Sequence, residues 1–189
     1  RGVVRITAAP GLAFAFCTPF AAWLKTELPE VRLELVSTVR YLDLLRREAD
    51  LALRIERRAE RDLVTLASIA VESVPFAFEA YAAKLGKRPR LADVDFVGWT
   101  SENDHLSPNA QLARAIPGWA PAFASDDYLV QIRAAEVGLG VIFLARAKHR
   151  FSRDTGLVEV DLGIPPVPSS VHLIAAKSSL AIPRVRAVA

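Results

Sequence analysis

The sequence contains one cysteine and no methionine among its 189 residues. A single cysteine excludes an intramolecular disulfide and fits the reducing cytoplasm, where we expect the protein to function. The longest apolar-rich stretch, Leu12 to Leu24, is interrupted by Thr18 and Pro19 and is too short to span a bilayer. No secretory signal is visible. Because the chain starts at Arg1 and contains no methionine, we expect a fragment whose N-terminal portion is missing.

Concentrated charge is also absent. The formal net charge is +3, and the lysines and arginines are scattered without interleaved aromatic residues. Nucleic-acid surfaces usually combine basic clusters with aromatic side chains that stack on bases. The basic residues therefore indicate solvated faces rather than a nucleic-acid patch in this chain. The apolar fraction of 52% is enough for a substantial core.

The spacings typical of metal and catalytic sites are missing. His105, His149 and His172 are widely separated, and no cluster of cysteine and histidine has metal-ligand spacing. No serine occurs in the Gly-x-Ser-x-Gly setting of a nucleophile elbow. Gly138 to Gly140 stops a helix before a strand, which is the reverse of a dinucleotide-binding loop. We therefore predict that the domain is not an enzyme and holds neither a metal nor a cofactor.

The first 55 residues have the pattern of a parallel α/β sheet. Strands are predicted over residues 3–6, 31–35 and 51–54, and helices over residues 12–28, with a kink at Pro19, and 41–48. This alternation is typical of a doubly wound sheet. The apolar run 51–54 suits an inner strand, and Arg54 lies at its carboxyl end. Open α/β sheets hold their ligands outside such ends.

A second α/β half is predicted after a long extended passage over residues 63–78, interrupted at Glu72. Ser125 or Asp126 is expected to cap a helix over residues 128–137. The first half comprises residues 1–73 and 164–189, the second comprises residues 74–163, and two crossings join them around a cleft. The remaining elements are predicted as helices over residues 81–85, 109–116 and 145–149, strands over 96–99, at 123, and over 140–144, 157–160 and 171–175, a Pro-rich link over 164–168, and a last helix from Pro183.

Four motifs together resemble the effector-binding domain of LysR-type transcriptional regulators. They are Arg1–Ala8, Thr18–Phe20 with Leu28–Leu35, Asp50–Arg54, and Ala134–Val141. They occur in order and at fitting spacing, and the resemblance covers essentially the whole chain. It implies an α/β fold of two Rossmann-like subdomains of the type 2 periplasmic-binding-protein kind. It also implies an N-terminal winged helix-turn-helix that would precede Arg1 and is not in this chain.

The resemblance further implies a function and partners. In such regulators a small molecule, often a metabolite or organic acid, binds between the subdomains and changes how the DNA-bound oligomer is arranged. A homodimer or tetramer is expected, formed by the apolar helices over residues 12–28 and 128–137, as symmetric dimers are the commonest oligomers. DNA would be contacted only through the missing N-terminal domain, and no contact with a membrane is expected.

The resemblance also places an effector site at two sets of residues. Helix N-termini and hydroxyls donate to anions, and the Arg54 guanidinium suits a carboxylate. Many relatives have a serine or threonine at the start of the first helix, where residues 8–11 of this chain supply none, so we expect a more apolar pocket. The site residues are Ala9, Pro10, Gly11, Ser37, Thr38 and Arg54 in the first subdomain and Thr100, Ser101, Ala124, Ser125 and Phe143 in the second.

Simpler interpretations stand beside this one. Arg54 could pair with Glu56 or another internal acid, and the hydroxyl pairs at 37–38 and 100–101 could cap helices. Cys17 is expected to be a buried small hydrophobe rather than a reactive thiol. Two other functions use similar folds: a solute-binding protein of a transporter, which needs an upstream signal peptide or lipoprotein cysteine, and a small lyase-type enzyme, which needs acid–base pairs. The sequence does not identify the effector, the promoter or the direction of regulation.

Overall fold

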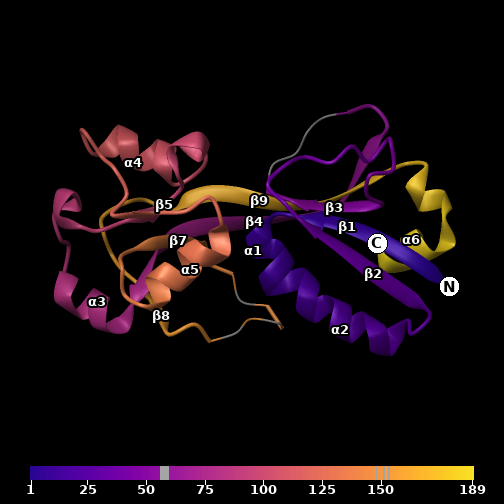
Figure 1. The fold of residues 1–189 in the computed structure, drawn as a ribbon, viewed down its shortest axis with the longest axis horizontal. Coiled ribbons are helices and arrows are strands. Elements are labelled where there is room, and N and C mark those ends of the chain that lie inside the picture. The colour runs from indigo at the N-terminus through magenta and orange to yellow at the C-terminus, as the bar shows by residue number, and fades with distance from the viewer. Residues whose placement is uncertain (56–59, 148, 151, 153) are drawn as a thin grey trace. The chain divides into compact units, whose positions relative to one another are not determined.

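The computed structural model describes residues 1–55, 60–147, 149–150, 152 and 154–189. The chain forms two compact units (Figure 1). Unit 1 contains Arg1–Val71, Lys148–Arg153 and Pro168–Ala189, and unit 2 contains Glu72–Ala147 and Asp154–Val167.

Helices and strands alternate along both units. The strands are β1 (Gly2–Ala8), β2 (Val31–Ser37), β3 (Leu51–Arg54), β4 (Leu63–Phe78), β5 (Val97–Gly98), β6 (Phe123–Ala124), β7 (Ile142–Ala145), β8 (Leu157–Glu159) and β9 (Val167–Ala176). The α-helices are α1 (Pro10–Leu12), α2 (Thr18–Glu27), α3 (Glu79–Leu85), α4 (Asn109–Ala115), α5 (Tyr128–Glu136) and α6 (Pro183–Val188). This pattern confirms the predicted α/β class.

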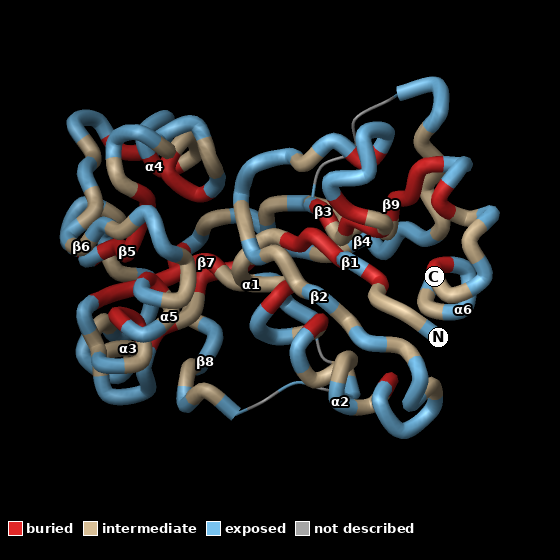
Figure 2. Tube along the Cα trace, turned by 45° about the vertical axis from the view of Figure 1, so that its right-hand side comes forward, coloured by how far each residue is buried: buried red, intermediate tan, exposed pale blue. Residues whose placement is uncertain are grey.

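The centre of unit 1 is a sheet with parallel strands. β1 pairs in parallel with β2 and with β3, so that Ala8 lies opposite both Ser37 and Leu53. β9 pairs antiparallel with β3, which confirms that the last strand returns to the first half. Val4 and Leu51 are buried beneath α6, and Figure 2 shows this burial along β1 and β3. The carboxyl ends of β2, β1 and β3 therefore lie at one edge.

The helix predicted over residues 12–28 is interrupted by a π-helical segment, Ala13–Cys17, between α1 and α2. Pro19 has no N–H to continue the α-helical ladder. The backbone N–H of Thr18 instead donates to the carbonyl of Ala13, five residues earlier, and the Thr18 hydroxyl donates to the same oxygen at 2.9 Å. The irregularity expected near Pro19 is therefore a π-turn, a common cause of helix bending.

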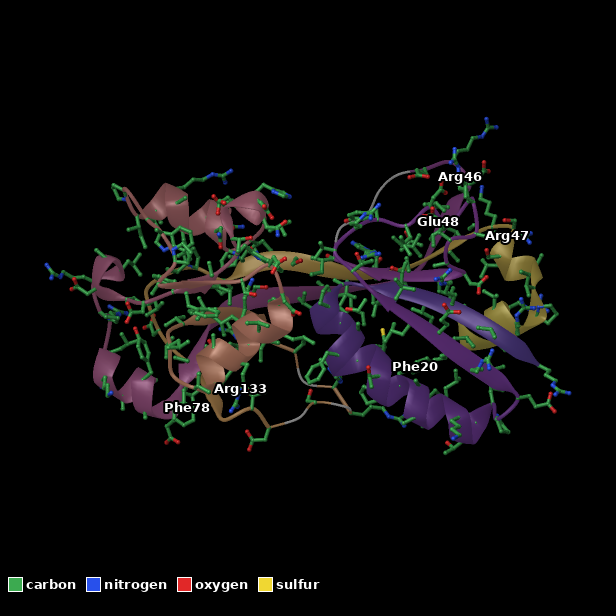
Figure 3. The ribbon with its side chains drawn as sticks, viewed as in Figure 1. Phe20, Arg46, Arg47, Glu48, Phe78 and Arg133 are labelled. Atoms are coloured by element: carbon green, nitrogen blue, oxygen red, sulfur yellow. The ribbon has the colours of Figure 1, made fainter. Side chains whose placement is uncertain are left out.

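The prediction of a helix over residues 41–48 is wrong, because these residues form a hydrogen-bonded turn. Asp43 Oδ1 accepts hydrogen bonds from two following backbone N–H groups, and Glu48 Oε2 accepts one from the Asp43 N–H at 2.7 Å. Arg47 has a φ of 60°, which no right-handed helix contains. Side-chain bonds to the local backbone compete with helix formation. Figure 3 shows Arg46, Arg47 and Glu48 on this turn.

Three further predictions need correction around the crossing strands. Residues 63–78 form one unbroken strand, since Ser73 continues the ladder by pairing with Ala145. Ala145 therefore ends β7 instead of starting a helix; residues 146, 147 and 149 are not helical, and residue 148 lies outside the described residues. The Pro-rich link predicted over 164–168 is shorter, because β9 already begins at Val167.

Unit 2 matches its predicted helices closely. α3, α4 and α5 lie within two residues of the predicted bounds, and α5 stops before Gly138, whose φ of 84° suits glycine. β5 and β6 pair in parallel, with Gly98 opposite Ala124, and Phe96 bridges Val141 in parallel. The carboxyl ends of these segments thus share an edge. None of the described helices is long and apolar enough to cross a membrane.

Candidate functional site

The six predicted site residues of the first subdomain lie together at the carboxyl edge of unit 1. Ser37 ends β2 opposite Ala8, and the Thr38 N–H donates to the Ala8 carbonyl at 3.0 Å. Ala9 is the N-cap of α1 and makes no side-chain capping hydrogen bond, and Pro10 occupies the first helical turn. The edge therefore presents an uncapped helix start, Pro10 and Gly11, beside the hydroxyls of Ser37 and Thr38.

Arg54 is buried at this edge, with only 3% of its surface exposed. Its Nη1 donates to the Thr38 carbonyl at 2.7 Å, and its Nη2 donates to the Arg40 carbonyl at 2.8 Å and to Thr7 Oγ1 at 2.6 Å. The guanidinium also lies over the Tyr41 ring, 5.2 Å from its centre. Burial lowers the pKa of Arg54, and the coulombic effect of Tyr41 partly offsets it.

These contacts give Arg54 a use that the sequence interpretation did not include. Within the described residues it forms no ion pair, and Glu56 lies outside them. Its partners are two carbonyls and one hydroxyl, all neutral. Arg54 therefore ties the chain that follows β2 to the end of β3. A carboxylate clamp requires donors that these bonds leave free.

Thr7 is a functional residue that the sequence interpretation missed. It was assigned to the connection after a strand ending at Ile6, whereas β1 continues to Ala8 and buries Thr7 completely. A buried threonine within an apolar strand needs a hydrogen-bond partner. The hydroxyl of Thr7 accepts from Arg54, a residue 47 positions later. The threonine at an inner-strand position was the available signal.

The predicted residues of unit 2 lie at the carboxyl edge of β5 and β6. Thr100 and Ser101 follow β5, and Ser125 follows β6, where its N–H donates to the Gly98 carbonyl at 3.1 Å. Ala124 is the last residue of β6 and is exposed. Parallel strands end at the same edge of a sheet. The residues that end or follow β5 and β6 therefore lie on one edge of unit 2.

Phe143 differs from its edge neighbours because its side chain is in the core. Only 5% of it is exposed, and its ring centre lies 6.5 Å from that of Phe96. Its carbonyl accepts a hydrogen bond from the Tyr128 hydroxyl at 3.3 Å. Burial raises the pKa of Tyr128 to about 12. The expectation that the Phe143 side chain lines the site is therefore wrong, because the ring packs in the core against Phe96.

A buried polar network holds the loop after β5 in place. Asn109 is 1% exposed; its Oδ1 accepts from the Trp99 N–H at 3.0 Å and its Nδ2 donates to the Trp99 carbonyl at 2.9 Å. The Trp99 ring stacks on Tyr128, with 5.9 Å between their centres. A Cβ on Gly98 would lie 2.6 Å from Asn109 Oδ1, so glycine is required there. This network positions Thr100 directly after it.

The Thr100 hydroxyl is the unsatisfied group at this edge. Its Oγ1 is buried and has no hydrogen-bond partner among the described residues. A buried hydroxyl without a partner costs about 1–3 kcal/mol of folding free energy. Each such group in a native protein needs an explanation, and a bound water or ligand is one of those available. The Thr100 hydroxyl therefore has a hydrogen-bonding capacity that the described residues do not use.

Asp127, not Ser125 or Asp126, caps α5. Its Oδ1 accepts from the Leu129 N–H at 2.8 Å, and the Ser125 hydroxyl accepts from the Asp127 N–H at 3.1 Å. The two predicted caps, Ser125 and Asp126, lie two residues and one residue before the observed cap. The Asp127 carboxylate already occupies the Leu129 N–H at the start of α5. The donor that remains at this edge is therefore the Ser125 hydroxyl.

No other constellation in the described chain offers chemistry. No group of three or more described histidine, cysteine, aspartate or glutamate residues could hold a metal ion. Cys17 is buried in the helical segment, and burial raises the pKa of its thiol to about 11. A thiol with that pKa stays protonated at neutral pH and is a poor nucleophile.

Two α/β units that gather hydroxyls and helix starts at the carboxyl ends of parallel strands define a bilobal small-molecule-binding domain of the periplasmic-binding-protein kind. The whole chain, residues 1–189, matches the family model described as the LysR substrate binding domain. The chain therefore belongs to this family and is a ligand-sensing regulatory domain of a LysR-type transcriptional regulator. Neither the solute-binding nor the lyase alternative gains support.

Solved structures with the same fold agree. The regulatory domain of CrgA, a LysR-type regulator from Neisseria meningitidis, is 20% identical, with a TM-score of 0.77 over 99% of this chain and 95% of that one. The regulatory domain of AphB from Vibrio vulnificus is 17% identical, with a TM-score of 0.70 over 99% and 96%. A second CrgA structure is 21% identical, with a TM-score of 0.74, and this chain covers 66% of it. The comparison with curated proteins gives no sequence match.

Proposed function

We propose that this domain binds a small-molecule effector at the residues predicted for its site. In unit 1 these are the start of α1 (residues 9–11), Ser37 and Thr38; in unit 2 they are Thr100, Ser101 and Ser125, with Ala124 at the edge. Arg54 contributes by holding the Thr38 carbonyl. The observation that carries the proposal is the buried Thr100 hydroxyl without a partner among the described residues.

The residues favour an effector with oxygen acceptors. Hydroxyls and backbone N–H groups donate to carboxylate, carbonyl or hydroxyl oxygens. The first helix supplies no hydroxyl, and its start is formed by Ala9, Pro10 and Gly11, so an apolar part of the effector meets that side. We therefore propose a small organic acid with an apolar portion as the effector class.

Thermal unfolding with a panel of organic acids tests this proposal. An effector at 100 times its dissociation constant stabilises the folded state by about 2.7 kcal/mol, which raises the Tm by roughly 5–10 °C for a domain of this size. Thr100→Val should weaken the effector about fivefold, the effect of one hydrogen bond. Thr26→Val, which removes an exposed hydroxyl at the end of α2, is the matched control.

The outcomes separate clearly. A panel without any stabilising acid contradicts the proposed effector class. An effector that binds Thr100→Val and Thr26→Val with equal affinity contradicts the proposed site, even if the ligand class is right.

We also propose that the domain acts as a homodimer or tetramer within a longer protein. The chain spans 66% of the length of one CrgA chain it resembles, which leaves room for a DNA-binding domain. Effector binding would then change how such oligomers sit on DNA, without any enzyme activity in this domain. We expect this to take place in the cytoplasm.

A further inference from the structure

We propose that unit 1 carries a second ligand pocket, beside its carboxyl edge, that binds a small apolar amino acid as its zwitterion. The pocket lies between the turn at residues 41–48 and the sheet and has a volume of about 200 Å³. Its lining includes Tyr41, Arg54 and Glu60.

The pocket exists because the local sequence does not form the expected helix. A helix over residues 41–48 would pack its leucines continuously against β3 and β9. The turn held by Asp43 buries Leu44 in a cluster with Ala52 and Ile174, while Leu42 and Leu63 stay partly exposed beside it. Space therefore remains between the turn and the sheet.

Arg54 supplies the recognition of a carboxylate. A guanidinium has five N–H donors, and three hydrogen bonds engage it, so two donors remain. All three acceptors are neutral, and the described part of the chain contains no carboxylate paired with Arg54. Buried charges are normally paired. A ligand carboxylate in this pocket would bring a negative charge to a guanidinium group whose residue is only 3% exposed.

The pocket has room for one branched aliphatic side chain. Its apolar walls come from Leu42, Leu44, Ala52, Leu63 and Ile174. An apolar cavity of about 150 Å³ holds a benzene molecule. A volume of about 200 Å³ thus fits a leucine-sized ligand but not a nucleotide.

The rim supplies an acid for the ammonium group. Asp43 is already engaged, since its carboxylate accepts two backbone N–H groups and lies 3.4 Å from Arg46 Nε. The Glu60 side chain has no hydrogen bond or ion pair within the described residues. A ligand with a carboxylate toward Arg54 and an ammonium toward Glu60 matches both charges. A simple carboxylate would bring no cation to the Glu60 side chain.

The pocket also has a physical connection to the effector edge. Arg54 holds the carbonyls of Thr38 and Arg40, which lie between β2 and the turn that roofs the pocket. A ligand carboxylate bound to Arg54 would share its guanidinium with the carbonyls of Thr38 and Arg40. Occupancy of the pocket therefore acts on the residue that positions Thr38.

Thermal unfolding and titration calorimetry with L-leucine test the pocket. The matched probes are 4-methylpentanoate, which lacks the ammonium, and 3-methylbutylamine, which lacks the carboxylate. At about 10 mM, which detects millimolar dissociation constants, we expect leucine to raise the Tm more than either probe does. Glu60→Gln should weaken leucine at least fivefold, and Ala52→Leu, which fills the pocket, should abolish its binding. Glu27→Gln, an exposed acid in α2, is the control and should leave it unchanged.

Each contrary result overturns the proposal. Wild-type protein that shows neither a Tm shift nor heat with leucine excludes the ligand class. Equal binding of leucine and 4-methylpentanoate excludes the zwitterion, and unchanged binding in Glu60→Gln excludes the rim. If Ala52→Leu does not fold, Glu60→Gln still decides. Loss of leucine binding in Thr100→Val would place the ligand at the carboxyl edges instead.

Discussion

Arg54 joins two elements that are distant in the sequence. Its three hydrogen bonds reach Thr7 in β1 and the carbonyls of Thr38 and Arg40 after β2. Hydrogen bonds that involve a charged group contribute more than neutral ones, because the charge strengthens them in a low-dielectric interior. Arg54 therefore serves the stability of the carboxyl edge as well as any ligand chemistry there.

Arg54→Ala should lower the free energy of unfolding by about 2–4 kcal/mol, since it removes these bonds and leaves a cavity. Arg54→Lys keeps the charge but not the planar fork and should be intermediate. Urea unfolding measures the loss. Arg46→Ala, on the exposed side of the turn, is the control and should stay within about 0.5 kcal/mol of the wild type. Equal stability of Arg54→Ala and Arg46→Ala would contradict the role.

Tyr128 predicts a dependence of stability on alkaline pH. Its folded pKa of about 12 is above the ordinary value of 10, because burial disfavours the phenolate. The folded state thus holds this proton more tightly than the unfolded state. The resulting stabilisation is complete below pH 10 and is lost as the pH rises through 12.

Tyr128→Phe should remove this part of the pH dependence. The free energy of unfolding of the variant should fall less steeply than that of the wild type between pH 10 and 12. At neutral pH the variant should lose about 1 kcal/mol, because the Phe143 carbonyl loses its donor. Parallel pH profiles for the two proteins would show that Tyr128 does not titrate differently in the folded state.

At the scale of elements, α5 depends on a single capping side chain. Asp127 accepts from the Leu129 N–H, and the negative charge is favoured at the positive end of the helix. Asp127→Ala should cost about 1 kcal/mol of stability. Asp126→Ala removes the same charge one residue earlier and should be nearly neutral. Urea denaturation of both variants distinguishes capping from general charge, and equal losses would rule out the cap.

Helices were predictable where the local sequence carries both a periodic apolar face and a terminator. α3 ends at Gly86 and α5 ends before Gly138, and both glycines have positive φ. The segments 41–48 and 145–149 contain residues that are compatible with a helix, but they do not combine a periodic apolar face with a terminating glycine. In the first, Asp43 binds the backbone locally; in the second, the Arg146 N–H donates to the Glu72 carbonyl at 2.6 Å and prolongs a sheet. Both outcomes depend on contacts that a helical pattern does not reveal.

At the scale of the whole molecule, exposed apolar side chains indicate association. Phe14 in the first helical segment is 42% exposed, and Val130 in α5 and Val137 just after it are 45% and 54% exposed. In unit 1, six residues after Phe14, Phe20 stacks on Phe16 with 5.9 Å between the ring centres. Figure 3 shows Phe20 on α2. Apolar residues grouped on a helix surface are typical of protein interfaces.

Val130→Glu should shift the protein from dimer toward monomer, since it places a charge within an apolar interface. Analytical ultracentrifugation over a range of concentrations measures the shift, which we expect to exceed tenfold in the dissociation constant. Ile69→Glu alters an apolar residue of β4 that is 65% exposed and outside both helices, so it serves as the control. A dimer unaffected by Val130→Glu, or a wild-type monomer, would contradict the proposed interface.

The α/β class, the order of strands and the family were accessible from the sequence alone. Strand and helix periodicities are local, and the four motifs lie within continuous stretches such as Asp50–Arg54. Parallel pairing also places the residues that follow β1, β2 and β3 at one edge, whatever their side chains are. For these reasons the residues of the candidate site could be named by position.

Only the tertiary structure decided what those residues contact. The bond from Arg54 to Thr7 spans 47 positions and depends on the register of β1 against β3. The buried Thr100 hydroxyl depends on how Asn109 holds the preceding residue. The space above Arg54 depends on a turn that replaced a helix. Local sequence determines elements, but burial and hydrogen-bond partners arise where distant elements meet, and these set the chemistry of a site.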